Sequence, residues 1–324
     1  MIAKTSTFND VELTVNLAAL FPGQGSQFVG MGKTLCKEFP IAELCFEEAE
    51  DSVKIPLRSL CFEGPEEELK KTEFTQPAIL THSIAVFRVL KSESSFNPKL
   101  FAGHSLGEYS ALVAAGVLNF ARAVFLVHNR GRFMQEAVPQ GEGAMAAVLN
   151  VDSMKLSAMC AEVAAVTGGV CELVNYNSPQ QIVVAGSKVA VDRLQELLTH
   201  AGLKSVSLPV SAPFHSSLML KARQKMEPLI HETSFQPLAP GVSFVPNVDA
   251  ELCKDSYQPE FLIRQIDSAV KWQQSMEVAE QAGFDTFAEV GPGRVLFGLG
   301  RRNFKNQPKL LHTDDIKETI KFFA

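Results

Sequence analysis

The stretch Phe101-Ala102-Gly103-His104-Ser105-Leu106-Gly107-Glu108-Tyr109-Ser110 joins a short apolar run to a segment rich in alanine, leucine and valine. Its Gly-x-Ser-x-Gly pattern at Gly103, Ser105 and Gly107 is typical of a nucleophile elbow, a strained turn between a strand and a helix. Such a turn lifts the serine hydroxyl above its strand and directs backbone N–H groups toward a negative charge that forms there. The stretch therefore predicts a nucleophilic Ser105, and a tight turn that contains a serine by chance is the alternative.

Length and composition restrict the class of protein. The chain has 324 residues, of which 46% are apolar and 20% charged, as expected for a globular chain with one large domain and a smaller insertion. A net charge of -6 argues against nucleic-acid binding. Six scattered cysteines without metal-type spacing, and no recognisable secretory leader, indicate reduced thiols in the cytoplasm. The apolar tract 111–127 contains Asn119 and Arg122, so it predicts two buried helices rather than a membrane span.

The rest of the chain around the elbow predicts further strands and helices. Residues 1–14 are mixed and polar, and we expect a poorly anchored tail there. The run 17–21 predicts a buried strand that leads into a glycine loop. The stretch 243–248 predicts a strand that runs into a loop, and 287–293 predicts a strand that ends in another glycine loop. Thr75-Gln76-Pro77 predicts the start of a helix, because proline is tolerated in a first helical turn.

The segment 119–137 predicts a helix with a charge inside its apolar sector. On a wheel of 100° per residue, Arg130 falls among the apolar residues, whereas Arg122 and Arg132 lie outside the centre of that sector. A buried guanidinium without a partner would cost several kcal/mol. We therefore expect Arg130 to face an anion or hydrogen-bond acceptors, and an internal carboxylate remains one candidate for that partner.

From Gly141 onward the pattern changes to strand-helix-strand-strand-helix-strand, which is the ferredoxin-like order. Strands are expected at 144–149, 170–176, 181–185 and 205–208, helices at 154–166 and 189–201, and a turn at Asn177-Ser178-Pro179. The α/β chain therefore divides into a core of residues 15–140 and 209–324 and an inserted subdomain of residues 141–208.

A nucleophilic serine needs a base that takes its proton, and the histidines are the candidates. His215 lies in a loop downstream of Ser105, beside Pro213 and Ser216, which fits the hydrolase order in which histidine comes last and predicts a position at the rim of the site. His104 neighbours Ser105, but adjacent side chains on an elbow diverge. The other histidines lie in helices or in polar settings: His82, His128, His200, His231 and His312. No aspartate stands out as a third member, and a backbone carbonyl can hold the imidazole instead.

Five motifs follow one another in the order seen in the acyltransferase family of fatty acid and polyketide synthesis. They are Phe21-Pro22-Gly23-Gln24-Gly25-Ser26-Gln27, Gly103-His104-Ser105-Leu106-Gly107-Glu108, Asn129-Arg130-Gly131, Pro213-Phe214-His215 and Glu289-Val290-Gly291-Pro292-Gly293. From residue 17 to about residue 302 the chain resembles the malonyl-CoA:acyl carrier protein transacylases of that family. The resemblance implies an α/β-hydrolase-like core with an inserted ferredoxin-like subdomain.

The resemblance also implies a ping-pong transfer of malonyl from malonyl-CoA to the phosphopantetheine thiol of acyl carrier protein, for fatty acid synthesis. The catalytic pair would be Ser105 as nucleophile and His215 as base. The implied binding groups are the backbone N–H groups of Gln24 and Leu106 as oxyanion hole, Arg130 for the malonyl carboxylate, and the backbone carbonyl of Gln265 for the orientation of the histidine.

The implied partners are acyl carrier protein and malonyl-CoA, and the implied state is a cytoplasmic monomer without metal, cofactor, nucleic acid or membrane contact. An N-terminal extension departs from the family pattern, and so does Phe214, where bacterial fatty-acid enzymes often carry serine. Because of Phe214, a free-standing polyketide-synthase acyltransferase remains a first alternative function. A hydrolase that clears acyl groups from carrier proteins is a second alternative, although it would have little use for Arg130. A docking module without catalysis is the third.

Overall fold

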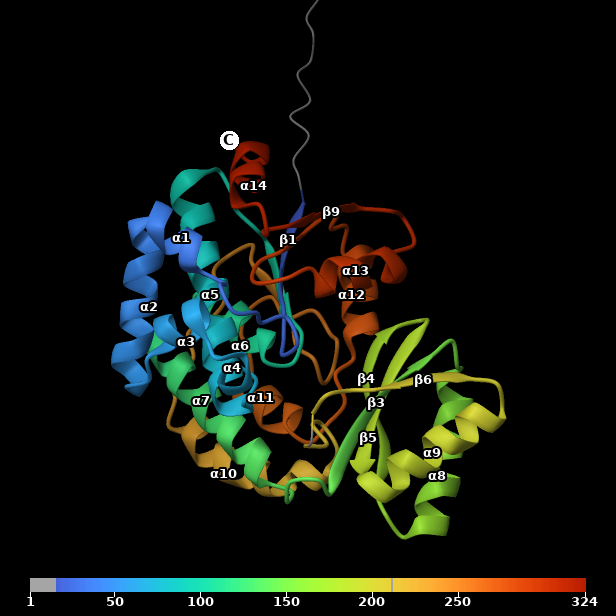
Figure 1. The fold of residues 1–324 in the computed structure, drawn as a ribbon. Coiled ribbons are helices and arrows are strands. Elements are labelled where there is room, and N and C mark those ends of the chain that lie inside the picture. The colour runs from blue at the N-terminus through green and yellow to red at the C-terminus, as the bar shows by residue number, and fades with distance from the viewer. Residues whose placement is uncertain (1–15, 211) are drawn as a thin grey trace, which may run out of the picture.

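The structure, a computed structural model, describes residues 16–210 and 212–324, so the expected N-terminal tail lies outside the described residues. The described chain forms a larger part around a parallel sheet and a smaller part around an antiparallel sheet (Figure 1). The chain leaves the larger part after α7 (Phe120–Glu136) and returns to it after β6 (Lys204–Ser207). The predicted α/β class is confirmed, with the smaller part inserted into the sequence of the larger one.

Five parallel strands form the sheet of the larger part, in the spatial order β7-β2-β1-β8-β9. They are β1 (Leu17–Phe21), β2 (Leu100–Gly103), β7 (Ser243–Val245), β8 (Thr286–Glu289) and β9 (Lys309–His312). Every residue of β1, β2 and β8 is buried, as in parallel strands whose two faces are both covered by helices. The strands predicted at 17–21 and at the start of 287–293 are confirmed, and the stretch 243–248 forms a strand over Ser243–Val245 that runs into a loop, as predicted. The more exposed edge strand β9 was not predicted.

Helices cover both faces of this sheet (Figure 1). In β1, Ala19 and Phe21 belong to the core cluster beneath α2, α5 and α7, whereas Ala18 and Leu20 pack with Trp272 of α12 on the other face. The helices of this part are α1 (Lys33–Glu38), α2 (Pro40–Val53), α3 (Leu57–Glu63), α4 (Glu66–Leu69), α5 (Thr72–Glu93), α6 (Gly107–Ala114), α7, α10 (Leu220–His231), α11 (Pro259–Gln265), α12 (Trp272–Gln281), α13 (Val295–Asn303) and α14 (Ile316–Phe322), with a short 3-10 turn at Ser217–Met219.

The helix that the sequence predicted to start at Thr75 starts at Thr72 and contains Pro77 in its second turn. Proline has no N–H to bond to the carbonyl four residues earlier, which belongs to Glu73. Nδ1 of His128 on α7 lies 3.0 Å from that carbonyl oxygen and supplies the missing donor. The predicted start was wrong because the compensating donor comes from a helix that is distant in the sequence.

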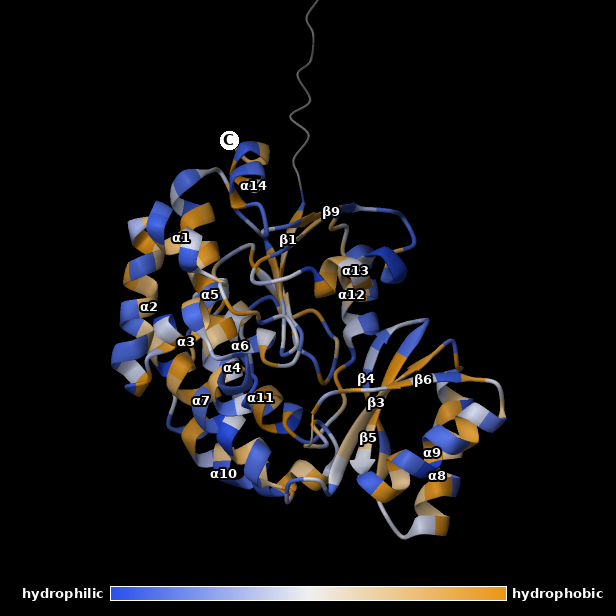
Figure 2. Ribbon diagram, in the orientation of Figure 1, coloured by the Kyte–Doolittle hydropathy of each residue, from blue (hydrophilic) through white to orange (hydrophobic). Residues whose placement is uncertain are grey.

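The smaller part has a four-stranded antiparallel sheet in the order β4-β5-β3-β6, with two helices packed on it. Its elements are β3 (Gly143–Leu149), α8 (Ser153–Thr167), β4 (Cys171–Ser178), β5 (Gln181–Ser187), α9 (Lys188–His200) and β6. Figure 2 shows apolar and polar residues alternating around α8 and α9, because one side of each helix faces the sheet and the other faces solvent. The predicted element order is confirmed, but β4 extends through Asn177 and Ser178, where a turn was expected.

Backbone and side-chain bonds join the two parts. Tyr176 N donates to Val270 O and Val270 N donates to Val174 O, both at 2.9 Å, so β4 pairs with the segment that precedes α12. Asn303 Nδ2 of α13 donates to Asn177 O at 2.9 Å. These contacts bring one face of the antiparallel sheet against the elbow. Among the described residues, none of the helices combines the length and apolar character that a membrane crossing needs.

Candidate active site

Ser105 lies between β2 and α6 with a backbone φ of 52°, in the left-handed region that residues other than glycine rarely adopt. The flanking glycines permit this turn because the backbones approach closely. A Cβ at Gly103 would lie 2.0 Å from the Gly107 carbonyl, and one at Gly107 would lie 2.0 Å from the Phe21 carbonyl oxygen. The chain therefore forms the strand-turn-helix context that a nucleophile elbow requires.

Asn247, which follows β7, holds both ends of the elbow. Its Oδ1 accepts from Ser105 N at 2.7 Å, and its Nδ2 donates to Gly103 O at 2.6 Å. The side chain is fully buried, so these bonds compete with no solvent. Asn247 was not predicted as a site residue, because nothing in the local sequence pattern places the end of β7 beside the elbow. Only the parallel pairing of β2 and β7 brings them together.

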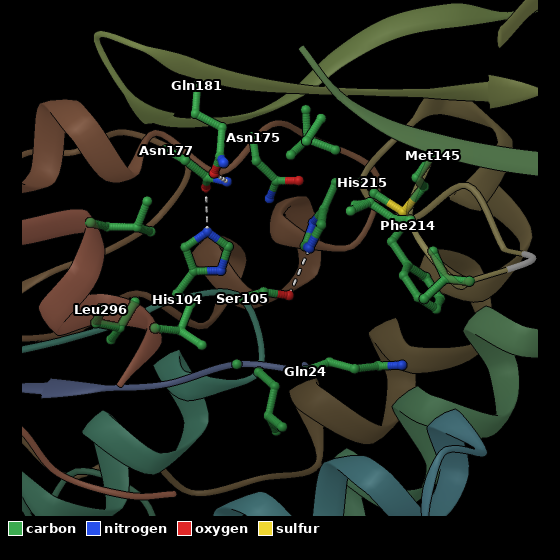
Figure 3. Close-up of a pocket in the computed structure, with 18 of the residues that line it drawn as sticks. Gln24, His104, Ser105, Met145, Asn175, Asn177, Gln181, Phe214, His215 and Leu296 are labelled. Carbon is green, nitrogen blue, oxygen red and sulfur yellow. Dashed lines mark hydrogen bonds between the residues drawn. The ribbon is translucent and has the colours of Figure 1, made fainter. Parts of the chain in front are cut away.

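His215 accepts a hydrogen bond from the nucleophile candidate. The Ser105 Oγ to His215 Nε2 distance is 2.7 Å (Figure 3), and Nδ1 of the same ring lies 2.7 Å from Gln265 O. A carbonyl oxygen only accepts, so Nδ1 carries the proton and Nε2 is left free to accept from the serine hydroxyl. The structure thus brings Ser105, His215 and the Gln265 carbonyl into one hydrogen-bonded row.

The imidazole of His215 is buried, with 4% of the residue exposed, so the expected rim position was wrong. Its backbone φ of 64° turns the side chain inward from the loop, and Pro213 O accepts from the Ser216 hydroxyl at 2.7 Å in the same turn. Burial, with a further contribution from the Arg130 charge, lowers the pKa of His215 to about 3. The ring is therefore neutral at physiological pH, which is the state in which it accepts a proton.

Arg130 is 1% exposed on α7 and has no carboxylate within 4.0 Å among the described residues. Its guanidinium donates to Gln76 Oε1 at 2.9 Å, Gln265 Oε1 at 2.9 Å and Ser105 Oγ at 3.2 Å. Its Nε has no partner in the described part of the chain. A buried cation that faces only neutral acceptors, 3.2 Å from the nucleophile candidate, has the chemistry to bind an anion, and that role for Arg130 stays a prediction.

Gln24 and Leu106 both line the cavity beside Ser105, and the backbone of each belongs to a turn at the end of a parallel strand. Leu106 stands at the N-terminal boundary of α6, where helix N–H groups point toward an anion. The structure places both residues next to the serine, and their part in an oxyanion hole stays a prediction.

The wall opposite Ser105 comes from the antiparallel sheet, and its amide side chains were not predicted. Asn177 Oδ1 lies 2.8 Å from His104 Nε2, and Asn177 Nδ2 donates to Gln181 Oε1 at 3.0 Å (Figure 3). Asn175, two residues earlier on the same strand, also faces the cavity. The spacing of two between Asn175 and Asn177 was the available signal, but the expected turn at 177–179 concealed it.

Between the two walls lies a cavity of about 420 Å³. Besides the polar groups, it is lined by apolar side chains, among them Met145, Val183, Phe214 and Leu296. Among the described residues no group of three or more His, Cys, Asp and Glu side chains gathers in a metal-binding arrangement. A serine hydroxyl beside a neutral imidazole and a buried guanidinium suits acyl transfer of a group with an anionic end.

Comparisons with known proteins agree with this chemistry. The acyl transferase domain family matches residues 19–319. The malonyl CoA-acyl carrier protein transacylase of Escherichia coli (strain K12) is 46% identical over 288 residues, which cover 88% of this chain and 92% of that protein. The protein of the same name from Bacillus subtilis (strain 168) is 45% identical, with coverages of 88% and 90%. The chain belongs to the acyl transferase family, within its malonyl CoA-acyl carrier protein transacylases.

Solved structures show the same fold. FabD from Acinetobacter baumannii superposes with a TM-score of 0.90 at 39% identity, covering 95% of this chain and 98% of that one. A malonyl-transacylase solved in complex with its type II polyketide-synthase acyl carrier protein gives a TM-score of 0.85 at 42% identity, with coverages of 92% and 94%. Both similarities extend over the parallel and the antiparallel part.

Proposed function

We propose that the malonyl group travels through this enzyme as an ester on Ser105. The overall reaction of the chain is that of its family: malonyl moves from malonyl-CoA to acyl carrier protein, for fatty acid synthesis. In the first half, Ser105 Oγ attacks the thioester carbonyl carbon, the C–S bond breaks, and CoA leaves as a thiol. In the second half, the phosphopantetheine thiol of the carrier protein attacks the ester, and the Ser105 hydroxyl is restored.

His215 moves the proton in both halves. Its neutral Nε2, 2.7 Å from Ser105 Oγ, takes the hydroxyl proton and returns it to the departing CoA sulfur. The Gln265 carbonyl, 2.7 Å from Nδ1, holds the tautomer in which Nε2 is the acceptor. When a malonyl carboxylate pairs with Arg130, the charge that lowers the pKa of His215 is partly neutralised, and the base becomes stronger once substrate is bound.

The tetrahedral oxyanion is stabilised by the backbone N–H groups of Gln24 and Leu106. Both residues line the cavity on the Ser105 side, and the N-terminal end of α6 adds its positive partial charge. Backbone donors held by the elbow need no reorganisation as charge develops on the oxygen.

The observation that carries this proposal is the buried Arg130 guanidinium, which has only neutral acceptors in the described part of the chain. Arg130 binds the free malonyl carboxylate through charge-assisted hydrogen bonds and thereby selects malonyl over acetyl. A hydrolase acting on carrier-bound acyl groups would use the same serine and histidine, but it would have no substrate carboxylate for Arg130 to bind.

We assign residues 15–140 and 209–324 to an α/β-hydrolase-like catalytic core and residues 141–208 to a ferredoxin-like subdomain. The parallel order β7-β2-β1-β8-β9 with the elbow after β2 supports the first assignment. The strand-helix-strand-strand-helix-strand order and the antiparallel arrangement β4-β5-β3-β6 support the second.

We propose acyl carrier protein and malonyl-CoA as partners, no cofactor or metal, and a monomer in the cytoplasm that binds neither nucleic acid nor membrane. The carrier-protein complex of the 42% identical malonyl-transacylase supports the first partner and keeps a polyketide pathway open as an alternative. All six cysteines are unbridged, which supports a reducing compartment.

Intact mass spectrometry tests the acyl-enzyme. Incubation with malonyl-CoA should add one malonyl group to the protein, and subsequent carrier protein should remove it and gain the same mass. Ser105→Ala should abolish the labelling, whereas Ser110→Ala, a matched change at a buried serine on α6, should retain it. Labelling that persists in Ser105→Ala would sink the assignment of the nucleophile.

A further inference from the structure

Glu108 is a buried carboxylate without a direct cationic partner, three residues after Ser105 on α6. It has 0% exposure, and no Lys, Arg or His of the described chain lies within salt-bridge distance of it. Three donors surround it instead: the Tyr257 hydroxyl at 2.6 Å from Oε1, and Gln265 Nε2 at 2.7 Å and Asn247 N at 3.2 Å from Oε2. Burial of an anion costs free energy, so a compensating role is expected for a carboxylate in this position.

Glu108 fixes the orientation of the Gln265 side-chain amide. Both hydrogens of Gln265 Nε2 are used, one by Glu108 and one by Ser105 O at 2.8 Å. Gln265 Oε1 is thereby turned toward Arg130 Nη2 at 2.9 Å. The flipped amide would place N–H groups against the guanidinium and an oxygen against the carboxylate, so the anion at Glu108 selects the orientation that Arg130 requires.

The Glu108 carboxylate also interacts electrostatically with the Arg130 guanidinium, although the two groups form no salt bridge. The guanidinium contacts only neutral groups, and one amide, that of Gln265, separates it from the carboxylate. Burial raises the pKa of Glu108 to about 7, while the hydrogen bonds from Tyr257, Gln265 and Asn247 N and, to a smaller extent, the Arg130 charge lower it. A carboxyl group with this pKa gains or loses a proton easily near neutrality.

We propose that Glu108 is a positioning residue that orients Gln265 and balances the charge of Arg130 while the acyl pocket is empty, and that it takes up a proton when a substrate carboxylate arrives. The inference rests on the proposed role of Arg130. With the pocket empty, Arg130 and ionised Glu108 together are neutral. With malonyl bound, a second anion enters the same buried site, and protonation of Glu108 restores neutrality.

The other ionisable groups around Glu108 do not titrate in the same range. They are Arg130 on α7, Tyr109 beside it on α6, and Tyr257 and Cys253 in the segment before α11. Burial raises the pKa values of both tyrosines above their ordinary value and that of Cys253 to about 11. Burial lowers the pKa values of His215 and His104, so both rings stay neutral. Among these ionisable groups, Glu108 is the one whose charge changes between pH 6 and pH 9.

The proposal predicts how malonyl-CoA binding changes with pH. Below about pH 7 Glu108 is neutral, and above it the anion repels the malonyl carboxylate, so the half-saturation concentration for acylation should rise with pH. If the bound malonyl carboxylate raises the pKa of Glu108 by about one unit, the half-saturation concentration should rise about tenfold between pH 6 and pH 9. Acetyl-CoA shares the CoA phosphates but has no carboxylate, and its inhibition constant should lack this rise.

Glu108→Gln tests the charge while keeping an acceptor for Gln265. The variant should lose the rise in half-saturation for malonyl-CoA between pH 6 and pH 9. Glu232→Gln, a matched change at an exposed carboxylate, should keep the wild-type profile. A Glu108→Gln profile that still rises like the wild type overturns the proposal, and so does a change that is equal for malonyl-CoA and acetyl-CoA.

Tyr257→Phe provides a second test if Glu108→Gln does not fold. It removes the donor at 2.6 Å from Oε1, and that donor lowers the pKa of Glu108. The inflection should therefore move to higher pH, by about one unit. An unmoved inflection contradicts the proposal. Malonyl labelling of Ser105, measured in the same samples, separates this inference from the proposed function. If the wild type is labelled but its half-saturation for malonyl-CoA does not change with pH, only the inference is refuted. If labelling is absent, the acyl-enzyme itself is refuted.

Discussion

The two walls of the cavity differ in chemistry. The wall from the parallel sheet and its helices holds Ser105, His215, Arg130 and Gln265, joined by buried or partly buried hydrogen bonds of 2.7–3.2 Å. The wall from the antiparallel sheet offers neutral amides, including Asn177, and apolar side chains. The first wall can stabilise changes of charge, whereas the second has the composition to enclose an acyl group and limit the access of water.

This difference follows from how the two sheets are built. Parallel strands end at a common edge, so β2 and β7 deliver the elbow and Asn247 to the same point, where helix N-termini also begin. The antiparallel sheet packs α8 and α9 on one face and leaves the other for the cavity, so alternate residues of β4 reach it. Charge is therefore concentrated on the wall from the parallel sheet. Three substitutions test whether the catalytic groups are concentrated on that wall as well.

His215→Ala should have the largest effect of the three. It removes the proposed base at 2.7 Å from Ser105 and should lower the acylation rate by about a thousandfold or more. Stopped-flow release of CoA measures this rate. His231→Ala, a matched change at an exposed position on α10, should act like the wild type. A wild-type rate in His215→Ala would point to His104 as the base and break the comparison.

Arg130→Ala should alter selectivity more than rate. Hydrogen bonds to charged groups contribute about 1.5–3 kcal/mol each, so the ratio of kcat/KM for malonyl-CoA over acetyl-CoA should fall by about a hundredfold. Acetyl transfer should be retained or rise, because no unpaired cation is buried when acetyl binds. Arg132→Ala, at an exposed position on the same helix, serves as control. An unchanged ratio with a lowered melting temperature would identify Arg130 as a structural residue.

Asn177→Ala should have the smallest effect, because it lies on the enclosing wall. It loses the contacts to His104 at 2.8 Å and Gln181 at 3.0 Å, each worth about 1 kcal/mol. Acylation should slow by about tenfold or less for malonyl-CoA, with no change in the malonyl-to-acetyl ratio. Asn306→Ala, in an exposed loop, is the matched control. A loss as large as that of His215→Ala would show that both walls share the chemistry.

Sequence alone determined the features that depend on local geometry. The elbow at Ser105 could be predicted because its glycines and its strand-to-helix context lie within ten residues. The burial of Arg130 followed from helical periodicity in 119–137, and the element order of 141–208 followed from alternating patterns. Each of these signals is contained in one segment of the chain.

Tertiary structure decided everything that joins distant segments. The donor that lets α5 continue through Pro77 comes from His128, and the clamp on the elbow comes from Asn247, 142 residues after Ser105. The burial of His215, and the donors that Tyr257 and Gln265 bring to Glu108, depend in the same way on segments packed together. Periodicity reports which face of an element is buried, but hydrogen-bond partners and pKa shifts depend on which atoms that burial brings within about 3 Å.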